Sequence, residues 1–166
     1  VPGTDVWRNY SYTHPADGRT ELEFIIRLLP DGAMSNYLRD RAKPGDRIAL
    51  RCSKGGFHLR PLVRPAVLVA GGTGLSAILA IAQSLDTALE QPIHLLYGVT
   101  GVEDLCKQNE LTELERRIPG LQVHVIVARP DPTWAGAVGL VTDLLDPAML
   151  GGDADVYLCG PGPMIE

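Results

Sequence analysis

A strand that runs directly into a cluster of glycines constrains the fold of this chain more than any other segment. Residues 67–74 read Val-Leu-Val-Ala-Gly-Gly-Thr-Gly, and a helix is expected to begin at Ser76. Glycines allow a backbone to approach a pyrophosphate, and the free N–H groups at the start of a helix favour an anion. The sequence therefore predicts a strand–turn–helix unit that binds a dinucleotide through Gly72, Thr73 and Gly74. The competing interpretation is a glycine-rich turn that binds nothing.

The rest of the second half alternates between apolar strands and amphipathic helices. Strands are expected at residues 66–70, 93–97, 123–128 and 156–159. Two helices carry apolar stripes, the first at Ile78, Leu79, Ile81, Ala82 and Leu85, and the second at Leu111, Leu114 and Ile118. Because strands that alternate with helices form a parallel sheet, we expect a doubly wound α/β domain over residues 63–166.

The first half, residues 1–62, has the periodicity of antiparallel strands instead. Alternating apolar residues predict strands at residues 21–27 and, more loosely, 47–52. Turn residues predict a hairpin loop at residues 15–18 and a tight turn at residues 43–46. We therefore expect an antiparallel β domain that ends at the proline-containing segment 61–65.

The glycine loop also matches a dehydrogenase fingerprint when its letters are taken literally. Residues 72–77 fit the pattern G-x-G-x-x-A, and Rossmann dehydrogenases with this pattern carry an acid at the end of the second strand to hold a ribose. Here that strand ends Tyr-Gly-Val-Thr at residues 97–100, and Glu103 and Asp104 follow later. This spacing weakens the interpretation as an ordinary Rossmann dehydrogenase.

Two features of the first half are compatible with a second nucleotide. In residues 8–12, Arg-Asn-Tyr-Ser-Tyr, a cation, aromatic rings and hydroxyls alternate, although a tyrosine-rich edge strand explains this segment alone at least as well. In residues 32–38 a glycine turn precedes Ser35, which we expect to be the N-cap of a short helix. Ser35 is explained equally by a plain helix cap, but two phosphate cradles in one chain suggest two nucleotides.

Charge and cysteine content exclude several other classes. The 15 basic and 20 acidic residues give a net charge of -5 without a basic run, so nucleic acid is a poor partner. Cys52, Cys106 and Cys159 are too scattered for a disulfide framework or a metal site, and we expect a reducing cytoplasm. No apolar run approaches the roughly 20 residues that span a bilayer. Because the chain starts at Val1 without methionine and stops at Glu166 where a helix would begin, we expect an internal fragment.

The order of these motifs resembles a known family. Arg8-x-Tyr10-Ser11, Gly32-x-x-Ser35, the glycine loop and Cys159-Gly160-Pro161-x-x-Met164 follow one another as in the FAD and NAD modules of the ferredoxin–NADP reductase superfamily. Residues 27–38, 97–100 and 157–161 are most similar to the reductase components of bacterial aromatic-ring dioxygenases of the benzoate type. The resemblance implies the later strands of an antiparallel FAD-binding barrel, followed by a doubly wound NAD-binding domain whose C-terminal end is missing.

The resemblance also implies roles for individual residues. Tyr10 would lie against the isoalloxazine, Ser11 would hydrogen-bond near flavin N5, and Arg8 with the turn at residues 32–35 would hold the pyrophosphate. Ser11 and Cys159 would be the catalytic residues, with Cys159 beside the nicotinamide C4 as a small polarizable group and not a nucleophile. The cofactor-binding residues are then Arg8, Tyr10, Ser11, Arg27, Gly32, Met34, Ser35, Gly72, Thr73, Gly74, Thr100, Cys159, Gly160 and Pro161.

The implied function is transfer of electrons from NADH through FAD to an iron–sulfur centre that serves a terminal oxygenase. A 2Fe–2S cluster would belong to a domain absent from this chain or to a separate ferredoxin. Glu103 and Asp104 favour NADH because they would repel a 2′-phosphate, whereas Arg129 argues weakly for NADPH. A free-standing NAD(P)H:flavin reductase and a non-catalytic nucleotide-binding regulatory module remain as alternatives.

Three other side chains have plainer interpretations. His94 and His124 lie inside apolar strands, where we expect histidines of the core or the sheet face and not metal ligands. Trp134 lies in a loop, where it either covers an adenine or packs on the domain surface.

Overall fold

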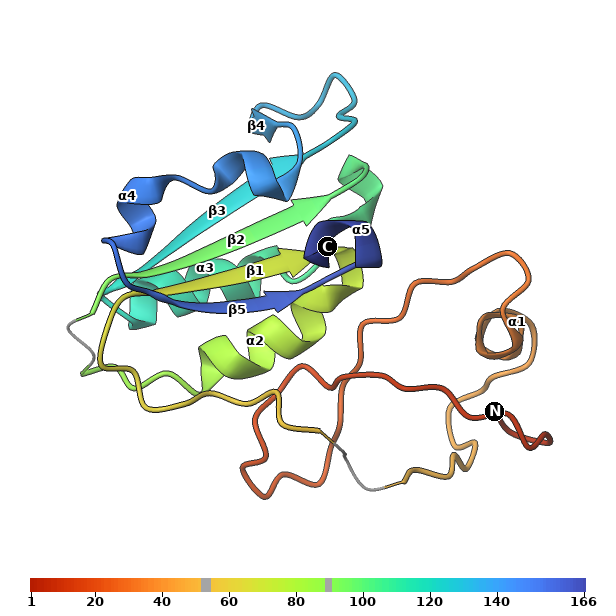
Figure 1. Cartoon of the computed structure of the whole chain (residues 1–166). Coiled ribbons are helices and arrows are strands. Elements are labelled where there is room, and N and C mark those ends of the chain that lie inside the picture. The colour runs from red at the N-terminus through yellow and green to blue at the C-terminus, as the bar shows by residue number, and fades with distance from the viewer. Residues whose placement is uncertain (52–54, 89–90) are drawn as a thin grey trace.

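The computed structural model describes residues 1–51, 55–88 and 91–166. Figure 1 shows two parts: a layered α/β part in the second half of the chain, and a first part of extended segments with one helix. Among the described residues, no helix is both long and apolar enough to span a membrane.

Five parallel strands form the sheet of the second part, in the order β4-β3-β2-β1-β5 (Figure 1). Their bounds are β1 Ala66–Gly71, β2 Ile93–Val99, β3 Leu121–Val127, β4 Ala137–Val138 and β5 Asp155–Cys159. The four strands expected from the sequence are confirmed. The two-residue strand β4 was not predicted, because so short a segment shows no periodicity.

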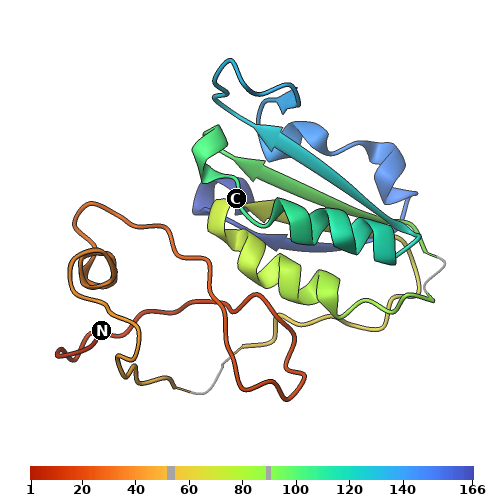
Figure 2. The same ribbon diagram turned by 180° about the vertical axis from the view of Figure 1, so that it is seen from behind.

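Helices cover both faces of this sheet, which confirms the doubly wound arrangement. On one face lie α2 (Leu75–Gln83) and α3 (Gln108–Arg117), seen in front of the sheet in Figure 2. The 3-10 helix η3 (Val141–Leu144) and α4 (Pro147–Leu150) lie on the other face. The shorter elements are η1 (Gly72–Gly74), η2 (Val102–Asp104) and α5 (Gly162–Ile165).

The core of the second part forms on both sides of β1, whose six residues are all buried. Leu68 and Leu95 pack with the apolar stripes of α2 and α3, and all the stripe residues expected from the sequence are buried. Val67 and Leu96 face the opposite side and pack toward η3 and α4. Burial of each side chain of this size stabilises the fold by about 1.5–3 kcal/mol. The strands are therefore held in the sheet by apolar contacts on both of its faces.

The start of α2 differs by one residue from the expectation. The helix begins at Leu75 and not at Ser76, because Gly72–Gly74 form a 3-10 turn that continues directly into it. Ser76 therefore lies inside the first turn, where it is 2% exposed.

The first part contains far less regular structure than the sequence pattern predicts. Its described residues form one antiparallel bridge, Tyr12 with Phe24, and one helix, α1 (Ala33–Asp40). The bridge confirms the hairpin around residues 15–18, but the strands expected at residues 21–27 and 47–52 form no ladder in the described segments. An extended segment becomes a strand only when another lies beside it at about 4.8 Å, and among the described residues the pairing is limited to the single bridge at Phe24. Residues 52–54, including Cys52, lie outside the described residues.

The tight turn expected at residues 43–46 is confirmed. The Asp46 amide donates to the Lys43 carbonyl at 3.1 Å, and Gly45 has a φ of 93°. The Tyr37 hydroxyl donates to the Asp46 carboxylate at 2.8 Å, which ties the turn to α1. The turn therefore fixes how the chain leaves this helix.

Candidate functional site

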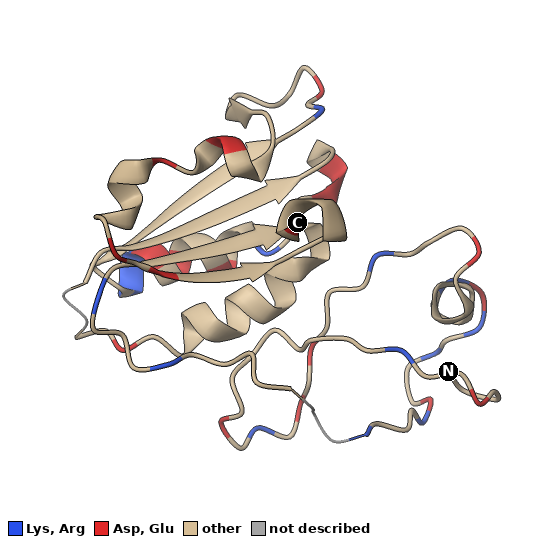
Figure 3. Cartoon of the chain, in the orientation of Figure 1, with Lys and Arg blue, Asp and Glu red and all other residues tan. Residues whose placement is uncertain are grey.

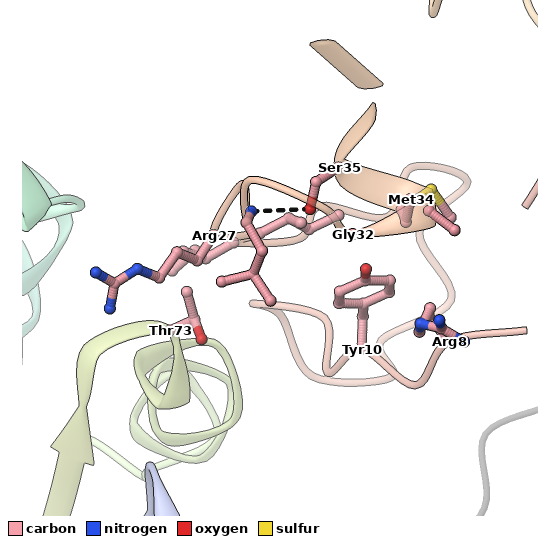
Figure 4. Close-up of a pocket in the computed structure, with 11 residues that line it drawn as sticks. Arg8, Tyr10, Arg27, Gly32, Met34, Ser35 and Thr73 are labelled. Atoms are coloured by element: carbon pink, nitrogen blue, oxygen red, sulfur yellow. Dashed lines mark hydrogen bonds between the residues drawn. The ribbon is translucent and has the colours of Figure 1, made fainter. Parts of the chain in front are cut away.

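A pocket of about 320 Å³ lies where the first part meets the glycine loop (Figure 4). Six residues expected from the sequence to bind flavin line it: Arg8, Tyr10, Arg27, Gly32, Met34 and Ser35. Thr73, expected to bind the second nucleotide, contributes from the glycine loop. Segments widely separated along the chain thus meet at a single pocket.

Tyr10 and two arginines give the pocket its polar character. The Tyr10 ring stands inside the pocket in Figure 4, with Arg8 on one side, while the Arg27 side chain extends away from Tyr10 at the opposite end. Arg8 is exposed, and its Nη1 donates to the Trp7 carbonyl at 2.9 Å, which leaves further N–H groups of its guanidinium for another acceptor. An exposed aromatic ring between two cations is suited to a planar ring system that carries phosphates.

Ser35 is not the N-cap that the sequence predicted. The N-cap of α1 is Gly32, in an extended conformation, and Ser35 lies in the first turn with 5% exposure. Its Oγ accepts a hydrogen bond from the Leu29 amide at 2.9 Å (Figure 4). Ser35 therefore fixes the loop before α1, and the anion-binding groups available here are the first backbone amides of the helix.

Apolar residues that the sequence analysis did not single out form the wall of the pocket. They are Ile25, Ile26, Leu29 and Ala33. Ile25 and Ile26 belong to segment 21–27, whose alternation predicted a strand, but a strand pattern does not reveal which of its faces meets a ligand. Ser11 is exposed and is not among the residues that line the pocket, so its role stays a prediction.

The glycine loop has one open position and one crowded position. Gly72 has a φ of 54°, a left-handed conformation that favours glycine, and open space where a side chain would begin. Gly74 packs directly on the end of β5, where an added Cβ would overlap the carbonyl of Cys159. The backbone is thus exposed at Gly72 and held in place at Gly74, as close approach to a pyrophosphate requires.

The motif at the end of β5 lies beside this loop. Cys159 pairs with Ala70 in register, and Met164 packs against Gly71 and Gly160 so closely that either glycine would clash with it if it carried a Cβ. Burial raises the pKa of the Cys159 thiol, so the group stays neutral near neutral pH. A neutral thiol fits the expected role of a small polarizable neighbour and not that of a nucleophile.

The residues expected to select between NADH and NADPH, Glu103 and Asp104 on one side of the argument and Arg129 on the other, follow the ends of β2 and β3. The Arg129 amide donates to the Thr100 carbonyl at 2.8 Å, so the arginine follows β3 directly beside the end of β2. Asp104 accepts from the Gly101 amide at 3.2 Å, whereas Glu103 is exposed on the same turn. Arg129 and the two acids therefore follow the ends of neighbouring strands.

His94, His124 and Trp134 make contacts within the second part and do not line the pocket. His94 and His124 lie on neighbouring strands with Nδ1 and Nε2 3.3 Å apart, which confirms the sheet-face interpretation, and burial lowers the pKa of His94. Trp134 Nε1 donates to the Ala137 carbonyl at 2.9 Å and its ring covers Gly136, so it packs on its own loop.

Charge is distributed unequally between the two parts (Figure 3). Residues 1–62 contain ten Lys and Arg and seven Asp and Glu, whereas residues 63–166 contain five Lys and Arg and thirteen Asp and Glu. The pocket thus opens on the more basic part, which favours an anionic ligand there.

Comparison with known protein families divides the chain into two matches. Residues 1–59 match the family described as oxidoreductase FAD-binding domain, and residues 68–166 match the oxidoreductase NAD-binding domain.

Relatives of similar sequence are electron transfer components. The anthranilate 1,2-dioxygenase electron transfer component of Acinetobacter baylyi is 44% identical over 171 residues, and the match covers 100% of this chain and 49% of the relative. The toluate 1,2-dioxygenase electron transfer component of Pseudomonas putida is 43% identical, with 100% and 49% covered. The chain thus spans about half the length of these relatives, 49% of each.

Solved structures of similar fold include two reductases. The crystal structure of Amycolatopsis cytochrome P450 reductase GcoB matches with a TM-score of 0.83 and 31% identity over 99% of this chain and 51% of that chain. The ferredoxin reductase in carbazole 1,9a-dioxygenase matches with a TM-score of 0.82 and 29% identity, covering 96% of this chain and 49% of that chain.

Proposed function

Since the chain belongs to the ferredoxin reductase family of FAD- and NAD-binding oxidoreductases, we propose that it passes electrons from NADH through FAD to an iron–sulfur centre. The protein would be the reductase component of a ring-hydroxylating dioxygenase. The observation that carries this proposal is the pocket in which Arg8, Tyr10 and Thr73 meet.

We propose that residues 1–62 are the FAD-binding unit and residues 63–166 the NAD-binding unit. The division is supported by the change from extended segments to an α/β sheet at β1. It puts the pocket residues in one unit and the glycine loop in the other, with Thr73 at their boundary.

The residues of this chain bind and orient the cofactors. Tyr10 offers a face for the flavin ring, while Arg8 and the first amides of α1 hold the FAD pyrophosphate. Gly72, Thr73 and Gly74 receive the pyrophosphate of NADH, and the remaining cofactor-binding residues proposed here are Ser11, Arg27, Gly32, Met34, Ser35, Thr100, Cys159, Gly160 and Pro161. The bound cofactors supply the chemistry, which is hydride transfer from nicotinamide to flavin followed by release of single electrons.

Two residues are proposed to act at the reacting atoms. Ser11 would donate a hydrogen bond near flavin N5, and Cys159 would lie beside nicotinamide C4. The raised pKa of the Cys159 thiol supports this role, because an uncharged group neither repels the hydride nor attacks the ring. Neither residue forms a covalent bond in this proposal.

We propose NADH as the electron donor. Glu103 and Asp104 at the end of β2 add two negative charges where a 2′-phosphate would lie, and Arg129 supplies one positive charge. A phosphate dianion is usually held by more than one cation, so the balance favours NADH.

The acceptor and the location of the protein are proposed from its relatives. Their names describe electron transfer components of anthranilate and toluate 1,2-dioxygenases. We propose that a 2Fe–2S cluster, in a further domain or in a separate ferredoxin, receives the electrons, and that the protein works in the cytoplasm.

The test is anaerobic addition of NADH to the full-length protein reconstituted with FAD. We expect loss of the flavin absorbance at about 450 nm, a band that belongs to the cofactor. Absence of bleaching would indicate a non-catalytic nucleotide-binding module. Bleaching in which reduced flavin leaves the protein at each turnover would indicate a free-standing flavin reductase.

A further inference from the structure

A cluster of polar side chains joins the first part of the chain to α2 and α3. We call it the Glu23 cluster, and its members are Thr13, His14, Glu23, Gln83, Lys107 and Glu110. Gln83 is the last residue of α2, and Lys107 is the N-cap of α3. None of these six residues is among those that line the pocket. The cluster is therefore a connection between the two parts and not a portion of the cofactor site.

Both oxygens of Glu23 are used in this connection. Oε1 accepts from Lys107 Nζ at 2.7 Å, and Oε2 accepts from Thr13 Oγ1 at 2.8 Å. The Lys107 ammonium, and then the Thr13 hydroxyl, hold the pKa of Glu23 below its usual range, so the carboxylate stays charged. Thr13 is fully buried, and thus one carboxylate links a buried residue of the first part to the start of α3.

Gln83 forms a second link between the two parts and determines which ring nitrogen of neutral His14 carries the proton. Its Nε2 donates to the Thr13 carbonyl at 3.2 Å, so its Oε1 must accept from His14 Nδ1, at 2.9 Å. Neutral His14 then carries its proton on Nδ1 and presents a lone pair on Nε2, which lies 3.4 Å from Glu23 Oε2. Gln83 therefore joins the backbone and the side chain of two consecutive residues of the first part to the end of α2.

The segment held by the cluster is the one that lines the pocket. Thr13 follows Tyr10 by three residues, and the Ile25 amide, two residues after Glu23, donates to Ser76 Oγ at 3.2 Å. Ile25 lines the pocket, and Ser76 lies in the first turn of α2, just after the glycine loop. Small movements at the cluster would therefore move the pocket wall against the glycine loop.

Lys107 adopts an unusual backbone conformation to take part. It is the one non-glycine residue with positive φ, 58°, among the described segments of the chain. A side chain with a Cβ reaches this conformation at an energetic cost, which the surrounding structure must offset. Hydrogen bonds from Nζ to Glu23 and to Glu110, the latter at 2.8 Å, provide such an offset.

We propose that Glu23 is a positioning residue for hydride transfer, and that through Thr13 and Lys107 it fixes the approach of the flavin-binding part to the NAD-binding part. This inference rests on the proposed function. Hydride transfer requires the reacting atoms to lie about 3–3.5 Å apart, and a displacement of about 1 Å can slow a reaction about a hundredfold. Glu23 acts through the two parts that it joins and does not itself line the pocket.

The experiment compares Glu23→Gln with Glu110→Gln in the full-length protein. Both substitutions remove one carboxylate partner of Lys107, but only the first breaks the connection between the two parts. We expect Glu23→Gln to lower the limiting rate constant of flavin reduction by NADH about tenfold, with the Kd values of FAD and NADH changed less than about twofold. Glu110→Gln should change all three quantities less than about twofold.

A second measurement does not depend on activity. The hydrogen exchange of the Ile25 amide reports its bond to Ser76, and we expect its protection to fall about threefold or more in Glu23→Gln and to stay unchanged in Glu110→Gln.

The outcomes separate this inference from the proposed function. If the unsubstituted protein reduces flavin, and Glu23→Gln matches it in rate and in Ile25 protection, the positioning role is wrong while the proposed function stands. If the unsubstituted protein reduces no flavin, the proposed function and the hydride-transfer role both fail, and Ile25 exchange still decides whether Glu23 holds the two parts together.

Discussion

The two parts of this chain reach their structures in different ways. In the second part, β1 is buried along its whole length and helices cover both faces of the sheet. In the first part, the described residues form one helix and one antiparallel bridge, and Leu22, Leu28, Ile48 and Leu50 are each more than 45% exposed. The difference shows that parallel strands joined by crossover helices bury apolar residues within their own segment, whereas extended antiparallel segments need neighbouring strands to do so.

The largest expected effect contrasts a core leucine of the second part with an exposed leucine of the first. Leu68→Ala removes a fully buried side chain from β1 and should lower the free energy of unfolding by about 2–5 kcal/mol. Leu50→Ala, at a residue 62% exposed, should change it by less than about 0.5 kcal/mol. Denaturant unfolding of the two variants measures both values. An equal cost for the two would mean that the first part packs its apolar residues in solution.

The same contrast explains how much of the fold could be predicted from sequence. The four longer strands and both apolar helix stripes were predicted because each segment shows its own periodicity and packs within its own part. The ladder expected around residues 21–27 was not found in the described segments, because alternation tells which residues share a face and not which strand lies beside them. The strand propensity of segment 21–27 therefore did not show whether a second strand would pair with it along its length.

The next effect tests whether the exposed first part nevertheless binds a cofactor. Arg8→Ala should weaken FAD binding by about 1.5–3 kcal/mol, the usual contribution of a charge-assisted hydrogen bond to phosphate. Arg116→Ala is the matched control, since Arg116 is an arginine of α3 whose side chain is 73% exposed and paired with Glu113. Titration of the apoprotein with FAD measures both. Equal affinities for the two variants would place the flavin away from Arg8.

The candidate site was predictable only where a motif fixed the backbone. Gly72 and Gly74 were recognised because a left-handed φ and a close contact with β5 each favour glycine. Ser35 was assigned to the wrong helix position, since its hydroxyl bonds the Leu29 amide across a loop whose path the sequence does not reveal. Glu23 and Lys107 gave no signal, because their pairing joins segments far apart along the chain.

A smaller effect is expected at Ser11, which lies in the first part but outside the pocket lining. Ser11→Ala should slow flavin reduction by NADH about threefold to tenfold, which corresponds to one hydrogen bond of about 1 kcal/mol made in the transition state. FAD affinity should stay nearly unchanged. Stopped-flow reduction and FAD titration measure the two quantities. Equal losses in both would show that Ser11 contributes to binding and not to the hydride step.

The smallest effect concerns the edge of the second part, where acids outnumber cations. Glu103 is exposed on the turn after β2, and in the proposed site its charge opposes that of Arg129. Because the charges are exposed, removing one should change an interaction by only about 0.5–1 kcal/mol. Glu103→Gln should therefore raise kcat/KM for NADPH about twofold to fivefold and leave kcat/KM for NADH nearly unchanged.

Glu113→Gln removes an acid of α3 that is paired with Arg116, and it serves as the control for a general change in charge. NADH should remain the better donor in all three proteins, because one arginine without a second cation holds a phosphate poorly. A protein that used NADPH as well as NADH before any substitution would show that Arg129 outweighs both acids.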